Sequence, residues 1–164
     1  MKVIFLDIDG VLNNDETEEY TPEGYLGIDD ILLARLKKIV ENTQAKIVLT
    51  TSWKDYWDKD ETNCKKDGLY INEKFKKFGL KIYDKTIDGG FDRGKGINKY
   101  LEDHKEVTNF LIIDDYMFKD FARYDYVKNM IYTDAEDGLS TSDAIEAINI
   151  LNNNYFKKEI GDAR

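Results

Sequence analysis

Two aspartates stand directly after the first apolar run of the chain. The run extends from Val3 to Leu6 and is followed by Asp7, Asp9 and Gly10. A buried strand gains nothing in packing from ending in paired acids, and two carboxylates this close repel unless a cation or a shared proton lies between them. Mg²⁺ takes oxygen ligands and favours carboxylates together with phosphate oxygens. The pattern therefore predicts a magnesium site in which one aspartate attacks phosphorus and the other transfers a proton.

The same acids have two simpler interpretations. Asp and Gly favour turns after strands, so Asp7 and Asp9 could be turn formers. They could also begin a calcium loop, but Val11 and Leu12 stand where that loop needs an oxygen ligand and a glycine, and a strand precedes them where the loop needs a helix. The turn interpretation weakens because further acids and hydroxyls follow other predicted strands.

Two more predicted strands end in residues able to do chemistry. The strand that begins at residue 46 ends in three hydroxyl residues, Thr50, Thr51 and Ser52. The strand over residues 109–113 is followed by two adjacent acids, Asp114 and Asp115. In open parallel sheets, ligands bind at the carboxyl ends of the strands, where the strand order reverses. If the first and fourth strands are neighbours there, Asp7, Asp9 and Asp114 converge into a site for a hard cation.

Strand and helix signals alternate along the chain, which predicts a parallel sheet covered by helices. The predicted strands are 3–6, 46–50, 80–83, 109–113 and 130–132, and the predicted helices are 29–40, 72–78, 96–104 and 140–151. Asp29 or Asp30 can cap the first helix, and Ser140 with Asp143 forms a capping box for the last. We therefore expect an α/β fold, a Rossmann-like three-layer α/β/α sandwich with a five-stranded parallel sheet.

Two segments, 13–28 and 53–69, look long and irregular. Loops of this size in a compact domain are usually functional or disordered. Both follow strand ends that carry candidate residues, so we expect them to border the same crevice. Trp53 and Trp57 lie four residues apart and would share one face of a helix, either packing against the core or forming a stacking platform for a base. Lys54 could contact a substrate phosphate or be solvated.

Length and composition are those of one domain with a sizeable core. The chain has 164 residues, of which 35% are charged, and we expect a single domain over 1–164 with a loose polar tail over 153–164. No stretch is long enough to cross a bilayer, and we see no signal peptide, so no membrane partner is expected. The single cysteine, Cys64, fits a reducing, cytoplasmic location and is predicted to be a surface thiol.

The formal net charge of −9 argues against broad nonspecific binding to nucleic acid. A locally basic groove remains compatible with that charge. A metal site built of carboxylates would itself contribute to the negative total.

The order of the motifs resembles the haloacid dehalogenase (HAD) superfamily of phosphohydrolases, over about residues 1–151. The first motif resembles LDIDGVL (6–12), and the second resembles KIVLTTS (46–52). In the third motif a basic residue opens a helix, as in RGKGI (93–97), and the fourth resembles LIIDD (111–115). The stretch IVLTTSWK (47–54) and the segment 133–140 further resemble a small branch of this superfamily. Domains of that branch accompany RNA-repair enzymes or stand alone.

The resemblance implies roles for the acids. Asp7 would be the nucleophile that forms an aspartyl-phosphate. Asp9 would protonate the leaving oxygen and then activate water, while its backbone carbonyl, and not its side chain, would bind the metal. Asp114 would bind Mg²⁺, with Asp115 a ligand through water or an orienting group.

The resemblance also implies partners for the phosphoryl group. Thr51 would donate a hydrogen bond to it, with Ser52 as the fallback and Thr50 facing back into the fold. Arg93 and Lys95 compete as the cation of the third motif. Helical spacing favours Arg93 and residue type favours Lys95, and we expect Arg93. Gly10, Ser52, Trp53 and Lys54 complete the candidate substrate contacts.

Together these features predict a Mg²⁺-dependent phosphomonoester hydrolase without a large cap domain. An open site favours bulky substrates such as a nucleic-acid end or a phosphoprotein, and small nucleotides also fit. A receiver-type phosphoacceptor domain is disfavoured. A receiver needs two adjacent acids after the first strand, an acceptor Asp after the third and a Lys after the fifth, whereas here the third strand is followed by Asp84 and the fifth by Thr133. A noncatalytic domain of HAD fold is the remaining alternative, and the intact acids argue against it.

Overall fold

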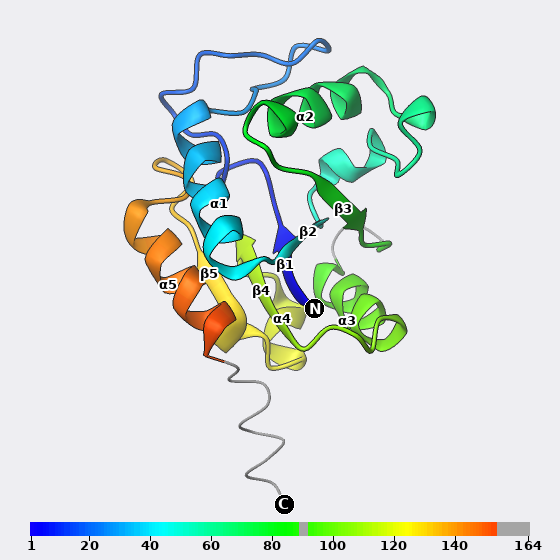
Figure 1. The fold of residues 1–164 in the computed structure, drawn as a ribbon, viewed down its shortest axis with the longest axis vertical. Coiled ribbons are helices and arrows are strands. Elements are labelled where there is room, and N and C mark those ends of the chain that lie inside the picture. The colour runs from blue at the N-terminus through cyan, green and yellow to red at the C-terminus, as the bar shows by residue number, and fades with distance from the viewer. Residues whose placement is uncertain (89–91, 154–164) are drawn as a thin grey trace, which may run out of the picture.

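A five-stranded parallel sheet forms the centre of the molecule in the computed structural model, which describes residues 1–88 and 92–153 (Figure 1). Its strands are β1 (Lys2–Leu6), β2 (Lys46–Leu49), β3 (Ile82–Lys85), β4 (Asn109–Asp114) and β5 (Met130–Tyr132). They lie in the order β3-β2-β1-β4-β5, and every neighbouring pair is parallel. The order therefore reverses at β1, and the predicted parallel α/β sheet is confirmed.

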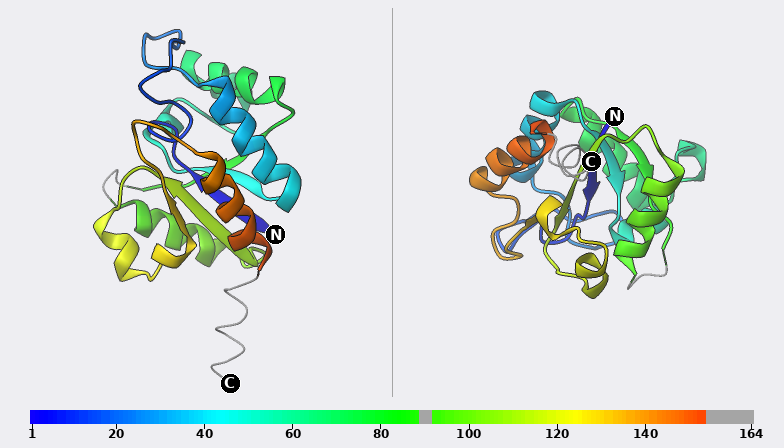
Figure 2. Two further views of the ribbon diagram at one scale, coloured as in Figure 1. Left: turned by 90° about the vertical axis from the view of Figure 1, so that its left-hand side faces the viewer. Right: turned by 90° about the horizontal axis from the view of Figure 1, so that it is seen from below.

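Helices cover both faces of this sheet (Figure 2). The helices are α1 (Asp30–Thr43), α2 (Lys66–Lys77), α3 (Arg93–Asp103), α4 (Lys119–Arg123) and α5 (Thr141–Asn152), with short 3-10 turns η1 (Ser52–Asp55), η2 (Glu61–Asn63) and η3 (Val127–Asn129). Apolar side chains of α1, α2 and α5 share one buried cluster, and those of α3 and α4 belong to a second cluster. The two clusters lie on opposite faces of the sheet, which gives the expected three layers.

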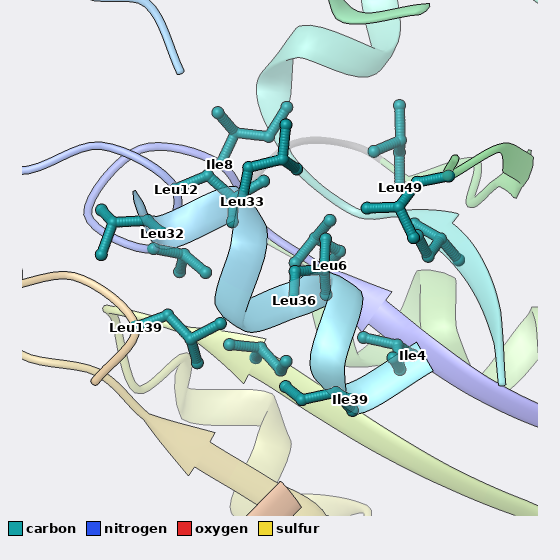
Figure 3. Packing of buried hydrophobic residues seen from close by; sticks show 14 of the residues in the cluster. Ile4, Leu6, Ile8, Leu12, Leu32, Leu33, Leu36, Ile39, Leu49 and Leu139 are labelled. Carbon is teal, nitrogen blue, oxygen red and sulfur yellow. The ribbon is translucent and has the colours of Figure 1, made fainter. Parts of the chain in front are cut away.

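Alternation along β1 separates the two clusters. Ile4 and Leu6 belong to the cluster beneath α1, whereas Val3 and Phe5 belong to the cluster beneath α3. All four side chains are fully buried, as expected for a central strand of a parallel sheet. Figure 3 shows the first cluster, in which α1 packs over the sheet through Leu32, Leu33, Leu36 and Ile39.

Several details of the structure differ from the sequence prediction, among them the start of α3, which is Arg93 and not residue 96. Helix α2 begins at Lys66, six residues before the predicted start, because Gly68 lets the helix pack against the backbone of Tyr56, where a Cβ would collide with the carbonyl oxygen. Leu80 is not in β3; its N–H donates to the Phe75 carbonyl and closes the end of α2. Cys64 is half-buried and its thiol bonds to the Asp58 backbone, so the prediction of a surface thiol is wrong.

The sequence analysis did not predict one helix, and one predicted segment lies mostly outside the described residues. Helix α4 has only five residues, too few for a periodic apolar signal, and was not predicted. Most of the predicted loose tail, from residue 154 onward, lies outside the described residues. Among the described helices, none combines the length and the apolar character needed to cross a bilayer.

The predicted capping box at the start of α5 offers a test of local stability. The Ser140 Oγ accepts from the Asp143 N–H at 3.0 Å, and an Asp143 carboxylate oxygen accepts from the Ser140 N–H at 3.0 Å. We expect Ser140→Ala to lower the free energy of unfolding by about 1 kcal/mol, measured by urea denaturation. Ser140→Thr keeps the accepting oxygen and should retain most of that stability. An equal loss in both variants would contradict the cap.

Candidate active site

The parallel register brings the reactive strand ends together. Leu6 of β1 pairs with Leu49 of β2 and with Ile113 of β4. Asp7 and Asp114 therefore follow side by side at the carboxyl edge of the sheet, and the predicted adjacency of the first and fourth strands is confirmed. One carboxylate oxygen from each of Asp7, Asp114 and Asp115 lies within 4.8 Å of the others.

Strand alternation points two of these acids toward α3. Asp7 continues the side of Val3 and Phe5, and Asp114 continues the side of Phe110 and Ile112, all on the face covered by α3 and α4. Both acids are buried, with Asp114 fully inaccessible to solvent. A helix that begins on this face can therefore deliver a cation to them.

Arg93, the first residue of α3, supplies that cation. Its Nη1 lies 2.6 Å from Asp114 Oδ2 and 3.2 Å from Asp7 Oδ1. The guanidinium carbon lies 4.7 Å from the centroid of the Phe118 ring, so an aromatic face also supports it. Lys95 is exposed, and its backbone N–H donates to Asp120. Of the two predicted cations, Arg93 is the one in contact with the acids.

The acids carry more negative charge than Arg93 compensates. Burial raises the pKa of the Asp7 carboxyl well above its usual range, and the charge of Asp114 raises it further, although Arg93 acts in the opposite direction. Burial likewise raises the pKa of Asp114, while Arg93 and the Tyr116 N–H, which donates to Asp114 Oδ1, lower it. A bound divalent cation would reverse this balance by favouring the ionised forms.

The donor set and its packing fit Mg²⁺. Three carboxylates from two neighbouring strand ends form a compact group of hard oxygen donors, which is what Mg²⁺ prefers. Gly10 makes room for one of them, because a Cβ there would collide with the Asp115 carboxylate. Gly10 also has a φ of +74°, and its carbonyl accepts from the Thr133 hydroxyl at 2.8 Å. The turn after Asp9 therefore requires glycine, both because a Cβ would collide with Asp115 and because the φ angle is positive.

The Asp9 carboxylate is not part of the group formed by Asp7, Asp114 and Asp115, and it has hydrogen-bond partners of its own. Its Oδ2 accepts from the Trp53 indole N–H at 3.0 Å, and its Oδ1 accepts from Asn13 Nδ2 at 2.9 Å. The Asn13 side-chain oxygen in turn accepts from the Gly10 N–H at 2.9 Å. Asn13 was not singled out from the sequence, although its place four residues after Asp9 in a tight turn was a usable signal.

The three hydroxyl residues after β2 have different surroundings. Thr51 is buried, and its hydroxyl oxygen accepts from the Trp53 N–H at 3.3 Å at the start of η1. Thr50 Oγ1 is buried and has no hydrogen-bond partner within residues 1–88 and 92–153. Strand alternation from Val48 places Thr50 on the face of Asp7, which differs from the expectation that Thr50 turns back into the fold. Ser52 is exposed.

The residues after Ser52 divide between packing and site contacts. Trp57 is buried in the core, and its indole N–H donates to the Asn72 side chain at 2.8 Å, as the packing interpretation predicts. Trp53 is also buried, but its indole N–H reaches Asp9. The ammonium of Lys54 forms a buried ion pair with Asp88 at 2.8 Å.

The two long connections meet beside Asp9. Thr21 donates to Asp67 of α2 at 3.0 Å, and the Ile28 N–H donates to the Tyr70 hydroxyl at 2.9 Å, so residues 13–28 are anchored on that helix. A cavity of about 340 Å³ opens between the connections, lined by Asp9, Tyr25, Leu26, Ser52, Trp53 and Tyr56. The prediction that both segments border one crevice is confirmed.

Fold, motif order and site geometry together define a domain of the HAD superfamily. Residues 3–144 match the family model described as the HAD domain in Swiss Army Knife RNA repair proteins, and the chain belongs to that family. No curated protein and no solved structure matches the chain significantly. Membership supports a phosphatase-type function in RNA repair.

The repulsion among the acids leads to a stability prediction. At neutral pH the buried Asp7 carboxylate is disfavoured, since burial raises its pKa in the folded protein, and the penalty vanishes as the pH falls and the group takes up a proton. We expect Asp7→Asn to raise the melting temperature of the metal-free protein, by roughly 2–4 °C for each kcal/mol of relief. Thermal denaturation in EDTA measures this.

The exposed Asp15 provides the matched control, because Asp15→Asn removes the same charge on the segment that follows Gly10. It should leave the melting temperature unchanged. A clear loss of stability in Asp7→Asn would mean that its pairing with Arg93 outweighs the repulsion.

Proposed function

We propose that the protein is a Mg²⁺-dependent phosphomonoester hydrolase that works through an aspartyl-phosphate on Asp7. The observation that carries the proposal is the group formed by the buried Asp7 and Asp114 and the half-buried Asp115, with Arg93 paired to Asp7 and Asp114 at the carboxyl edge of the sheet. Structural acids are rarely buried together without compensation, and perturbed carboxyls at a strand edge are typical of catalytic sites.

The first half of the reaction transfers the phosphoryl group to Asp7. A carboxylate oxygen of Asp7 forms a bond to phosphorus while the bond from phosphorus to the leaving oxygen breaks. Asp9 gives its proton to that oxygen, so the leaving group departs as an alcohol. The contacts of Asp9 with Trp53 and Asn13 support this division of labour, because they hold its carboxylate outside the acidic group.

The second half releases phosphate. Asp9, now ionised, accepts a proton from a water molecule whose oxygen attacks phosphorus. The bond between phosphorus and the Asp7 oxygen breaks, which regenerates the Asp7 carboxylate and yields inorganic phosphate. Asp9 ends the cycle protonated, ready for the next substrate.

Several residues of the chain offset the charge of the phosphoryl group. Asp7, Asp114 and Asp115 would hold Mg²⁺ with the Asp9 backbone carbonyl, and the bound ion supplies charge neutralisation for phosphoryl transfer. Arg93 offers guanidinium donors at the same edge. Two buried hydroxyls are candidate donors to the phosphoryl group. The Oγ1 of Thr50 has no hydrogen-bond partner among the described residues, and the Thr51 hydroxyl accepts from the Trp53 N–H but keeps its own hydrogen to donate.

A phosphorylated nucleic-acid end is the substrate class we favour. Within the described residues, the site is bordered by the 13–28 connection and short 3-10 turns, with no inserted domain over it, so a bulky substrate can approach. The family is that of HAD domains in RNA repair proteins, which favours a nucleic-acid end over a phosphoprotein. Net charge −9 is consistent with recognition of an end over long-range backbone binding.

A phosphatase screen tests this proposal. The substrates are an aryl phosphate, 3′- and 5′-phosphorylated oligonucleotides and phosphopeptides, each assayed with Mg²⁺ and with EDTA. We expect activity only with Mg²⁺, none in Asp7→Asn, and a loss of roughly 10²–10⁴-fold in kcat for Asp9→Asn because proton transfer is removed. Asp15→Asn should match the wild type. Wild-type turnover by Asp7→Asn, or no turnover of any substrate, would refute the proposal.

A second comparison separates the two candidate cations. Arg93→Ala should lower kcat/KM by roughly 10²–10³-fold, since it removes donors aimed at the phosphoryl charge. Arg93→Lys should recover part of that activity because a positive charge remains without the fork geometry. Lys95→Ala is the matched control and should stay close to wild type; the reverse ranking would assign the role to Lys95.

A further inference from the structure

The cavity beside Asp9 has the dimensions and position of a ligand pocket. Its volume of about 340 Å³ lies at the small end of the range for small-molecule sites, roughly 300–1,000 Å³. Residues distant in sequence form its walls, and the anchoring of the 13–28 connection on α2 holds Tyr25 and Leu26 opposite the residues of η1.

Three aromatic side chains line the cavity. Trp53 is almost buried, with 5% of its surface exposed, and its indole is fixed by the hydrogen bond to Asp9. Tyr56 is half-buried, and Tyr25 is 56% exposed. The charge and hydrogen bonding of the nearby Tyr25 hydroxyl raise the pKa of Tyr56, which shows that the two phenol groups lie close together. Because Tyr25 and Tyr56 are partly exposed, their rings offer accessible aromatic surface beside the fixed indole of Trp53.

The cavity also has a defined relation to the reaction. Asp9 forms part of its wall and is the residue that protonates the leaving oxygen in the proposed mechanism. The space next to Asp9 is therefore where the leaving group must lie. Lys65, whose ammonium is 5.6 Å from the centroid of the Tyr56 ring, adds a positive charge beside the pocket.

We propose that this cavity binds the nucleobase of the nucleoside whose phosphate is removed, through stacking on Tyr25, Trp53 or Tyr56. The inference rests on the proposed phosphatase function for the orientation of the leaving group. Stacking is tolerant of sequence because every base has a π face, so the pocket recognises a base without selecting one strongly. The nucleoside is either the terminal residue of a nucleic acid or a free nucleotide.

The kinetic test compares ends with and without a base. The substrates are an oligoribonucleotide with a terminal phosphate, the same chain with an abasic terminal residue, and a nucleoside monophosphate. We expect the wild type to have about tenfold higher kcat/KM for the base-containing end than for the abasic end. Tyr25→Ala and Tyr56→Ala should each bring that ratio toward one. Tyr20→Ala is the matched control, since Tyr20 is an exposed tyrosine on the same connection and does not line the cavity.

Two kinetic outcomes overturn the inference. Equal hydrolysis of the base-containing and abasic ends would show that the cavity does not bind a nucleobase, and it would leave the phosphatase proposal intact. Preferred hydrolysis of a phosphopeptide, lost in Tyr25→Ala, would assign the pocket to a protein side chain. Comparison of the oligonucleotide with the nucleoside monophosphate shows which source of the base the protein uses.

A binding measurement separates failure of the pocket from failure of the proposed activity. The chain has two tryptophans, and the Trp57 indole is bound to Asn72 outside this cavity, so it serves as an internal control. Addition of a nucleoside monophosphate without metal should shift the Trp53 indole N–H resonance in NMR spectra and leave that of Trp57 in place, with the shift lost in Tyr25→Ala. Such a shift in a protein with no phosphatase activity would support the pocket and refute the activity. No shift of the Trp53 resonance would overturn the pocket.

Discussion

Crowding of three carboxylates at one edge of the sheet, two of them buried, is the constraint on which the rest of the site depends. Asp7, Asp114 and Asp115 approach within a few ångströms, where their mutual repulsion and the cost of desolvation are both large. One guanidinium, from Arg93, touches Asp7 and Asp114. In the proposed function the remaining negative charge would attract a divalent cation, and folding of the sheet supplies the energy that keeps the acids together.

The fold controls which side chains share that edge. Parallel pairing of β1 with β2 and β4 aligns the strand ends, and alternation then turns Asp7 and Asp114 toward α3, where Arg93 begins the helix. The turn after Asp9 is equally constrained, because Gly10 must leave room for Asp115 and present its carbonyl to Thr133. In the proposed mechanism, proton transfer by Asp9 and cation binding by Asp7 would therefore lie on different sides of the same turn.

Much of this arrangement could be predicted from the sequence, because its signals are local. Apolar runs marked the strands, and Ser140 and Asp143 marked the start of α5. Acids after β1 and β4 indicated a group of carboxylates at the sheet edge once those strands were taken as neighbours. The orientation of Thr50 could not be derived in this way. After the exposed Lys46, both faces of β2 are buried, so Ile47, Val48 and Leu49 are all apolar and the sequence shows no alternation between the two faces.

Features that depend on tertiary contacts were also beyond local signals. The early start of α2 depends on close packing of Gly68 against Tyr56, and the role of Asn13 depends on how the turn folds back toward Asp9. The predicted crevice was correct in outline, since long connections after functional strand ends tend to meet. Its aromatic lining emerged only when residues 13–28 were placed against η1.

Calorimetric titration with Mg²⁺ tests the central claim most directly, because it measures the shared cation site without relying on any substrate. The account predicts one binding event per chain, abolished by Asp114→Asn and preserved in Asp15→Asn. Absence of binding to the wild type, or equal binding by the Asp114→Asn protein, would contradict it.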